Sequence, residues 1–390
     1  MTPTQDRPGA TPADPPPSAA GRPEPSAADA RSGAARVLDT VARFQGIVVP
    51  VVAVLLAFAI GAVLIRLQGV NPTYAYKTLF GSALLTPDGL LRTLQKATPL
   101  ILTGLAVVVG LRVGLFNIGA QGQLLWGALG AAVIGVSLAG LPAIALVPAA
   151  LIVGVIGGAL WGAIAGALKA YRGVHEVIST IMLNLIAAGL IDYLVSGPLK
   201  EPDQSIPRSA PIDPAATLPN LGVLPSGFVL AVALAFAVAW VLRRTTLGFR
   251  FDVVGKNRWA AQYAGIRIPA IVVGAMALSG GLAGLGGAIE TLGVVGQYES
   301  GSSAGLGFDG ITIALLARAN PIATIPAAIL VGVMRSGASS LQFDTGIQPE
   351  VVDVLLAITL LLVSLPILAR LVVGRRRAKD GVAVTSGWGS

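Results

Sequence analysis

The chain has 390 residues, of which 54% are hydrophobic and only 12% are charged, and its mean hydropathy is +0.78. In soluble globular proteins about a quarter of the residues are charged, so this composition excludes that class and predicts an all-α polytopic membrane protein. The chain has no cysteine and one histidine, which excludes disulfides and thiolate metal sites, and its net charge of +8 follows the loops between apolar runs rather than a nucleic-acid-binding surface.

Residues 1–45 differ in composition from the rest of the chain. They are rich in proline, alanine, serine and aspartate and show no apolar periodicity. Such a segment buries too little apolar surface to fold, so we expect a disordered cytoplasmic tail. We do not expect a signal peptide, because the first apolar run begins near Gly46 and is not followed by a small-residue cleavage site.

Apolar runs recur through residues 46–373 and predict about ten transmembrane or half-membrane helices. Most of the runs approach the ~20 residues that a helix needs to cross a bilayer. The run 309–317 is too short to cross and predicts a half-helix or a re-entrant segment. The predicted spans are 46–65, 97–111, 119–139, 143–168, 176–196, 226–242, 269–290, 309–317, 321–338 and 350–373.

Basic residues between the spans predict the orientation of the chain. The positive-inside rule places the most basic loops in the cytoplasm, so we expect both termini there, with residues 374–390 as a basic cytoplasmic tail. The first outside loop is the exception, since it also carries several basic residues. The residues assigned to the cytoplasm are Lys169, Arg172, Arg243, Arg244, Arg250, Lys256, Arg258, Arg267, Arg375, Arg376, Arg377 and Lys379.

Two series of glycines predict close helix packing. Small residues on one helix face allow two membrane helices to approach closely. We expect these faces to meet other helices of the same chain, the alternative being an interface with a second subunit. The series are Gly154, Gly158, Gly162 and Gly166 in one span, and Gly280 and Gly284 in a later one.

A polar break interrupts the apolar runs at RVGLFNIGAQGQLL, residues 112–125. The glycines in it allow a helix to break, and Asn117 would be the N-cap of a helix that resumes at Ala120. Unpaired N–H groups at that helix start, together with the amides of Gln121 and Gln123, would suit a neutral solute with hydroxyl or amide groups. The alternative is a plain cytoplasmic turn.

A second polar stretch, GVHEVISTIMLNLIAAGL, begins another span at residues 173–190. Glu176 complements the helix N-terminus. Thr180 and Asn184 are four residues apart, so they share a helix face that either lines a solute path or forms interhelical hydrogen bonds. His175 is assigned to the cytoplasmic rim, since a catalytic or metal site would need further partners.

A third stretch, TTLGFRFDVVGKNRWAAQYAGI at residues 245–266, lies in the most basic cytoplasmic loop. Asn257 would cap a short helix, Arg258–Ala264, on which Trp259 and Tyr263 share one face. A short helix with an aromatic face and basic flanks is suited to docking on a cytoplasmic protein. Docking on lipid headgroups is the alternative.

Together these stretches resemble the permease subunits of bacterial ABC importers for nucleosides or simple sugars, in the branch related to ribose and branched-chain amino acid permeases. The resemblance covers residues 45 to 375, and the order of its motifs is similar to that of the first of two unlike permeases that such systems encode. It is carried by LRVGLFNIGAQGQLLWGALGA (111–131), HEVISTIMLNLIA (175–187), TTLGFRFDVVGKNRWAAQYAGI (245–266) and GFDGITIALLARANP (307–321).

The resemblance implies a multi-pass permease of the plasma membrane, paired with a paralogous permease, with a cytoplasmic ATP-binding cassette ATPase and with an extracytoplasmic substrate-binding protein. The chain contains no P-loop, so ATP would be bound by the separate ATPase, and we expect no cofactor, metal site or enzymatic activity in this chain. The path would be lined by Asn117, Gln121, Gln123, Thr180 and Asn184. The coupling helix and its flanks would be Gly255, Lys256, Asn257, Arg258, Trp259, Ala260, Ala261, Tyr263 and Gly265.

The chain departs from the family pattern at three positions. Gln121 and Lys256 stand where acidic residues are usual, and His175 stands where asparagine is usual. Gln121 removes a charge from the predicted path, and Lys256 changes the charge of the docking loop.

Two other functions are open. An ion-coupled secondary transporter of a small neutral solute would carry ionisable residues at membrane depth, and the candidates here are few: Asp192 and Glu290 fall toward span ends, and Arg112 sits at a boundary. An intramembrane enzyme would need a catalytic constellation, for which His175 beside Glu176 is the only pair.

Overall fold

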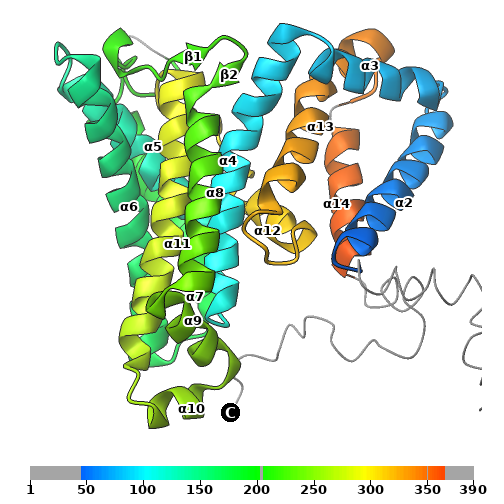
Figure 1. Cartoon of the computed structure of the whole chain (residues 1–390). Helices are drawn as coiled ribbons and strands as arrows, with labels where there is room; N and C mark the ends of the chain where they lie inside the picture. The colour runs from blue at the N-terminus through cyan, green and yellow to red at the C-terminus, as the bar shows by residue number, and fades with distance from the viewer. Residues whose placement is uncertain (1–44, 203–204, 349, 365–390) are drawn as a thin grey trace, which may run out of the picture.

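A computed structural model describes residues 45–202, 205–348 and 350–364, and they fold mainly into helices (Figure 1). The predicted tails lie outside these residues apart from Gln45. The α-helices are α2 (Gln45–Leu67), α3 (Pro72–Leu84), α4 (Pro87–Arg112), α5 (Ala120–Ser137), α6 (Ala143–Arg172), α7 (Glu176–Ser196), α8 (Ser226–Arg244), α9 (Thr246–Lys256), α10 (Arg258–Tyr263), α11 (Ile268–Glu290), α12 (Leu306–Leu316), α13 (Thr324–Thr345) and α14 (Glu350–Ser364).

The remaining elements are short. A 3-10 turn, η1 (Pro214–Ala216), and a hairpin of β1 (Asn220–Leu221) and β2 (Leu224–Pro225) lie between α7 and α8, and a π-helical turn, η2 (Thr291–Val295), extends α11. The hairpin and α10 lie at opposite ends of the molecule (Figure 1). We refer to these ends as the hairpin end and the α10 end.

Within the described residues each predicted span corresponds to a helix, and the all-α polytopic fold is confirmed. Residues 365–373 of the last predicted span lie outside the described residues. Within the described residues, seven helices are long and apolar enough to cross a membrane. The expected half-helix is α12, with 11 residues. The largest difference is in α4, which begins at Pro87 rather than near residue 97, because Thr86 caps it by accepting a hydrogen bond from the Gly89 N–H at 3.0 Å.

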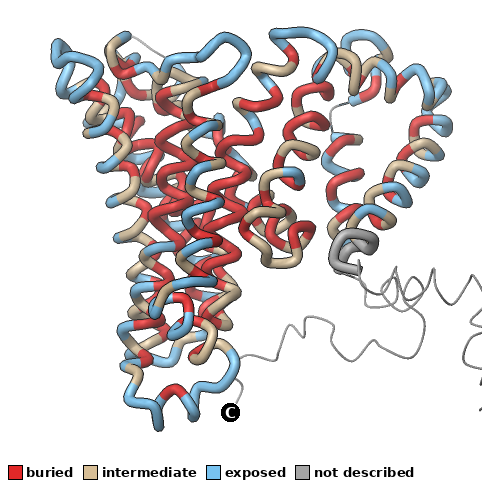
Figure 2. Tube along the Cα trace, in the orientation of Figure 1, coloured by how far each residue is buried: buried red, intermediate tan, exposed pale blue. Residues whose placement is uncertain are grey.

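The helices form a core of α4 and α11 inside more exposed neighbours (Figure 2). α11 packs against α4, α5 and α6, whereas α4 also contacts α8, α12 and α13. α4 therefore joins two groups of helices, the larger one around α11 and the smaller one of α2, α3 and α12–α14. The outer face of α6 carries an apolar stripe suited to lipid, formed by Ile144, Ile152, Ile156, Leu160 and Ile164.

The two glycine series pack α6 directly against α11, as predicted for helices of one chain. A Cβ atom on Gly158 would lie 2.2 Å from the carbonyl oxygen of Gly280, and one on Gly284 would lie 2.4 Å from that of Gly154. The two backbones are thus in contact, and no larger residue fits at this crossing.

Candidate functional site

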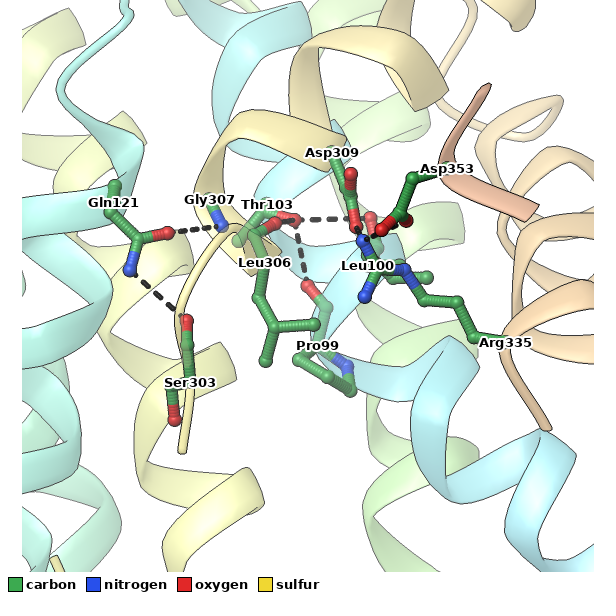
Figure 3. A network of polar contacts seen from close by, with 10 residues as sticks. All are labelled: Pro99, Leu100, Thr103, Gln121, Ser303, Leu306, Gly307, Asp309, Arg335 and Asp353. Atoms are coloured by element: carbon green, nitrogen blue, oxygen red, sulfur yellow. Dashed lines mark hydrogen bonds and ion pairs between the residues drawn. The ribbon is translucent and has the colours of Figure 1, made fainter. Parts of the chain in front are cut away.

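Two helices begin in the interior of the molecule, and one side chain connects their first turns. The starting residues, Ala120 of α5 and Leu306 of α12, are buried. Gln121 accepts a hydrogen bond at Oε1 from the Gly307 N–H (2.8 Å) and donates one from Nε2 to the Ser303 carbonyl oxygen (3.0 Å) (Figure 3). Gly307 packs so closely against α5 that a Cβ atom on it would lie 2.3 Å from the backbone nitrogen of Gln121.

The start of α5 is also held by a side chain of α7. Asn184 accepts a hydrogen bond at Oδ1 from the Gly122 N–H (2.8 Å) and donates one from Nδ2 to the Ile118 carbonyl oxygen (3.0 Å). The sequence left two roles open for the polar face of α7, which were hydrogen bonding to another helix and lining a path. The structure shows the first of these at Asn184, which binds the start of α5. The prediction of unpaired N–H groups at the α5 start is wrong at Gly122, whose N–H is capped.

Asn117 is not the N-cap residue that the sequence predicts. That position is occupied by Gly119, which has no capping side chain of its own. Asn117 instead accepts at Oδ1 from the Gly119 N–H (2.9 Å) and donates from Nδ2 to Gln123 Oε1 (2.8 Å) and Ser279 Oγ (2.7 Å). The Ser279 hydroxyl in turn donates to the Ala106 carbonyl oxygen, so the network joins α4, α5 and α11.

All five residues predicted to line the path are buried. Four of them belong to the amide network just described. Thr180 lies beside it, because a Cβ atom on Gly119 would be 3.1 Å from the Thr180 Cβ, but its hydroxyl donates to the Glu176 carbonyl oxygen of its own helix. Their side chains form hydrogen bonds with other atoms of this chain.

Three charged residues lie on the side of α12 that faces away from Gln121 (Figure 3). The sequence analysis did not identify them as a group. Arg335 of α13 lies 2.6 Å from Asp309 of α12 and 3.5 Å from Asp353 of α14 (Figure 3). We call these three residues the charged cluster. Each falls inside a predicted apolar span, and this signal was available in the sequence. The sequence analysis named only Asp192, Glu290 and Arg112 as ionisable candidates at membrane depth, and the charged cluster adds to them.

The structure confirms the short helix predicted in the most basic loop, which is α10. Asn257 caps it by accepting a hydrogen bond from the Ala260 N–H at 3.0 Å, and the helix ends at Tyr263, one residue before the predicted Ala264. The side chains of Trp259 and Tyr263 are 71% and 93% exposed. The helix is therefore built to leave two aromatic side chains uncovered at the α10 end.

The predicted coupling residues divide into an exposed set and a packed set. Ala261 is fully buried, and a Cβ atom on Gly255 would lie 2.3 Å from the Arg112 carbonyl oxygen. These two residues fix α10 and α9 to the rest of the molecule. The exposed set is Lys256, Asn257, Arg258, Trp259, Ala260, Tyr263 and Gly265.

An ion pair also links α9 to α4. Arg112 at the end of α4 lies 3.2 Å from Asp252 of α9, and both side chains are about one-third exposed. A second pair, Lys169 with Glu176 at 2.8 Å, joins α6 to α7 and is almost fully buried. His175 is half-exposed and lies 3.9 Å from the same carboxylate, which is consistent with its predicted place at the rim.

At the hairpin end, the loop between α7 and α8 is fixed to α5. The Asp213 N–H donates to the Gly135 carbonyl oxygen, and its carboxylate accepts hydrogen bonds from the N–H groups of Ala215 (2.8 Å) and Gly140 (3.0 Å). These bonds lower the pKa of Asp213.

Nearby, Glu290 lines a cavity of about 10 Å³ together with Gln95 and Ser226, about the space that one water molecule occupies.

Comparison with known proteins agrees with this architecture. A family model described as branched-chain amino acid transport system / permease component matches residues 89–364. The guanosine ABC transporter permease protein NupP of Bacillus subtilis is 36% identical over 349 residues, which cover 87% of this chain and 99% of the relative.

Two further relatives are of similar length. The glucose ABC transporter permease protein TsgB13 of Haloferax volcanii is 36% identical over 355 residues, covering 87% of this chain and 93% of the relative. The nucleoside ABC transporter permease protein NupB of Lactococcus lactis subsp. cremoris is 33% identical over 344 residues, covering 85% and 94%. The similarity therefore extends over nearly all of each relative.

Proposed function

The chain belongs to the branched-chain amino acid transport system / permease component family, and on this basis we propose that it forms the membrane path of an ATP-binding cassette importer for a nucleoside or a simple sugar. The observation that carries the proposal is the pair of bare aromatic side chains on α10. Trp259 and Tyr263 are four residues apart on one exposed face of a capped helix, which is suited to insertion into a groove of a partner protein. In an importer of this type that partner is the ATPase.

We assign the α10 end to the cytoplasm. The loops and helix ends there carry the densest set of basic residues, as the positive-inside rule requires. The hairpin end would then face the substrate-binding protein, and its hydrogen-bonded loop around Asp213 offers a fixed surface for it. The described basic residues of the α10 end are Arg112, Lys169, Arg172, Arg243, Arg244, Arg250, Lys256, Arg258 and Arg267.

A movement of the ATPase that shifts α10 would be transmitted to the proposed path residues through α9 and α4. α10 follows α9 directly, and α9 packs on the end of α4 through Gly255 and the Arg112–Asp252 pair. The chain then runs from α4 through residues 113–119 to the start of α5, where the amide network lies. A shift of α9 would therefore move the segment that holds the network closed.

The amide network supplies the chemistry for a neutral solute. Asn117, Gln121, Gln123 and Asn184 carry both donors and acceptors and no charge. When these bonds open, the freed amides and the N-terminus of α5 could form hydrogen bonds with hydroxyl or amide groups of a nucleoside or sugar. Closing them again would release the solute. A paralogous permease would contribute the other half of the path.

The docking proposal is tested by the double variant Trp259→Ala/Tyr263→Ala in the assembled transporter. We expect normal abundance in the membrane, because both side chains are exposed, and at least a tenfold loss of ATP-dependent uptake and of transport-linked ATP hydrolysis. Tyr171→Ala is the matched control, since Tyr171 is a 70% exposed aromatic residue at the same end but outside α10. ATP-dependent uptake at the normal rate in the double variant would contradict the assignment.

A further inference from the structure

The charged cluster lies at the depth of the apolar spans. Arg335 is near the middle of α13, and Asp309 is in the first turn of α12, which lies at about mid-height in the molecule (Figure 1). Asp353 is in the first turn of α14, which begins below the level of α3 in the same view. All three charges are therefore placed where a lipid-facing surface is normally apolar.

The cluster is nevertheless partly uncovered. The Asp353 side chain is 64% exposed, Arg335 is 27% exposed and Asp309 is 18% exposed. Charged groups at this depth are found facing a bundle interior or a water-filled space, because contact with hydrocarbon is costly. The exposed face of α14 around Asp353 is thus expected to meet water or polar groups.

The cluster shares its helix with the amide network. Ser303 and Gly307, at the start of α12, bind Gln121, and Asp309 follows two residues after Gly307. Thr103 of α4 also approaches the start of α12, with its hydroxyl 3.3 Å from the Leu306 carbonyl oxygen. Figure 3 shows the amide contacts on one side of this turn and the three charges on the other.

We propose that Asp309, Arg335 and Asp353 form a charged wall of the solute path, on which a neutral, hydroxyl-bearing solute forms hydrogen bonds. The inference rests on the proposed function and adds a second set of path residues on α12, α13 and α14. The guanidinium donates to hydroxyl oxygens of the solute, and the carboxylates accept from its O–H and N–H groups. The 3.5 Å contact of Arg335 with Asp353 is the looser of the two and is the one that a solute would open.

The test uses introduced thiols, since the chain has no cysteine of its own. Asp353→Cys in the assembled, membrane-embedded transporter is treated with a small cationic methanethiosulfonate, and its rate of modification is compared with that of Leu160→Cys. Leu160 is 63% exposed on the apolar stripe of α6, so it reports the reactivity of a lipid-facing thiol. We expect Asp353→Cys to react at least tenfold faster, and its modification to block uptake.

A second variant covers the case in which Asp353→Cys does not assemble. Ala357→Cys lies one turn further on the same exposed face of α14 and keeps all three charges. Modification of both thiols as slowly as that of Leu160→Cys would overturn the proposal, as would fast modification that leaves uptake intact. The rates are measured without solute, so a failure of the proposed function would appear in uptake by the unmodified protein and not in these rates.

Discussion

Gln121 shows why an amide, rather than a carboxylate, stands between the two interior helix starts. Its side chain meets a donor, the Gly307 N–H, and an acceptor, the Ser303 carbonyl oxygen, at the same time. A neutral amide satisfies both, whereas an ionised carboxylate is an acceptor only and would face the Ser303 oxygen without a proton between them. The amide at this position thus has a structural reason in this chain.

This leads to a prediction for Gln121→Glu. At neutral pH we expect the free energy of unfolding to fall by about 1–3 kcal/mol, because one buried carbonyl oxygen loses its donor. The loss should shrink as the pH is lowered, since a protonated carboxyl group regains an O–H donor. Thermal unfolding in lipid nanodiscs across pH measures both effects, with Gln68→Glu at an exposed position as control. A loss that is independent of pH would contradict the hydrogen-bond explanation.

At the level of single residues, the sequence predicted several local relations, although not the N-cap of α5, and it missed distant ones. The capping of α10 by Asn257 and the shared face of Thr180 and Asn184 follow from spacing alone. The partners of Asn184 and Gln121 lie far away along the chain, and no local pattern identifies them. The three charges were overlooked for a different reason, because each was read as a single residue inside an apolar run and not as a group.

At the level of helices, hydropathy located every span but not every boundary. Hydropathy detects residues suited to lipid, and it therefore missed the first turns of α4, which carry polar residues. The start of that helix is set instead by the capping hydrogen bond of Thr86. α3 and α9 were not predicted, because they are less apolar and lie at the two ends of the molecule (Figure 1). Burial by protein and capping therefore set the boundaries that lipid-based patterns could not.

The crossing of α6 and α11 gives a prediction at this scale. Gly280→Ala places a Cβ atom 2.2 Å from the Gly158 carbonyl oxygen, so the helices must separate, at a cost of about 1–3 kcal/mol. Gly274→Ala on the same helix has no atom within 4 Å of its Cβ and should be neutral or slightly stabilising. Thermal unfolding of the two purified variants measures the difference. Equal unfolding temperatures would show that this contact does not limit stability.

At the level of the whole molecule, α4 is the element that connects the two ends of the proposed mechanism. It runs from the hairpin end to α9 and packs against α11, α12 and α13 on the way. Its link to α9 combines a backbone contact at Gly255 with the Arg112–Asp252 pair, which is part-exposed and adds little stability by itself. The role that we propose for this link is geometric, since it fixes α9, and with it α10, to α4.

The family and function of the whole chain were easier to infer from the sequence than the three-dimensional contacts of its polar residues. Motifs such as FNIGAQGQ and GKNRWAAQY, together with composition, were enough to indicate the family that the comparisons establish. That the amides at the α5 start form hydrogen bonds within the protein depends on three-dimensional contacts among α4, α5, α7, α11 and α12. No one-dimensional pattern contains that information.

The most direct measurement is uptake by proteoliposomes that contain this chain with its partner permease, the ATPase and the substrate-binding protein, using guanosine and glucose as test solutes. We predict uptake of one of them that requires ATP and disappears when the ATPase is omitted or its P-loop lysine is replaced. A sodium or proton gradient alone should not support it. Full uptake by this chain without the ATPase, driven by such a gradient, would contradict the proposed function.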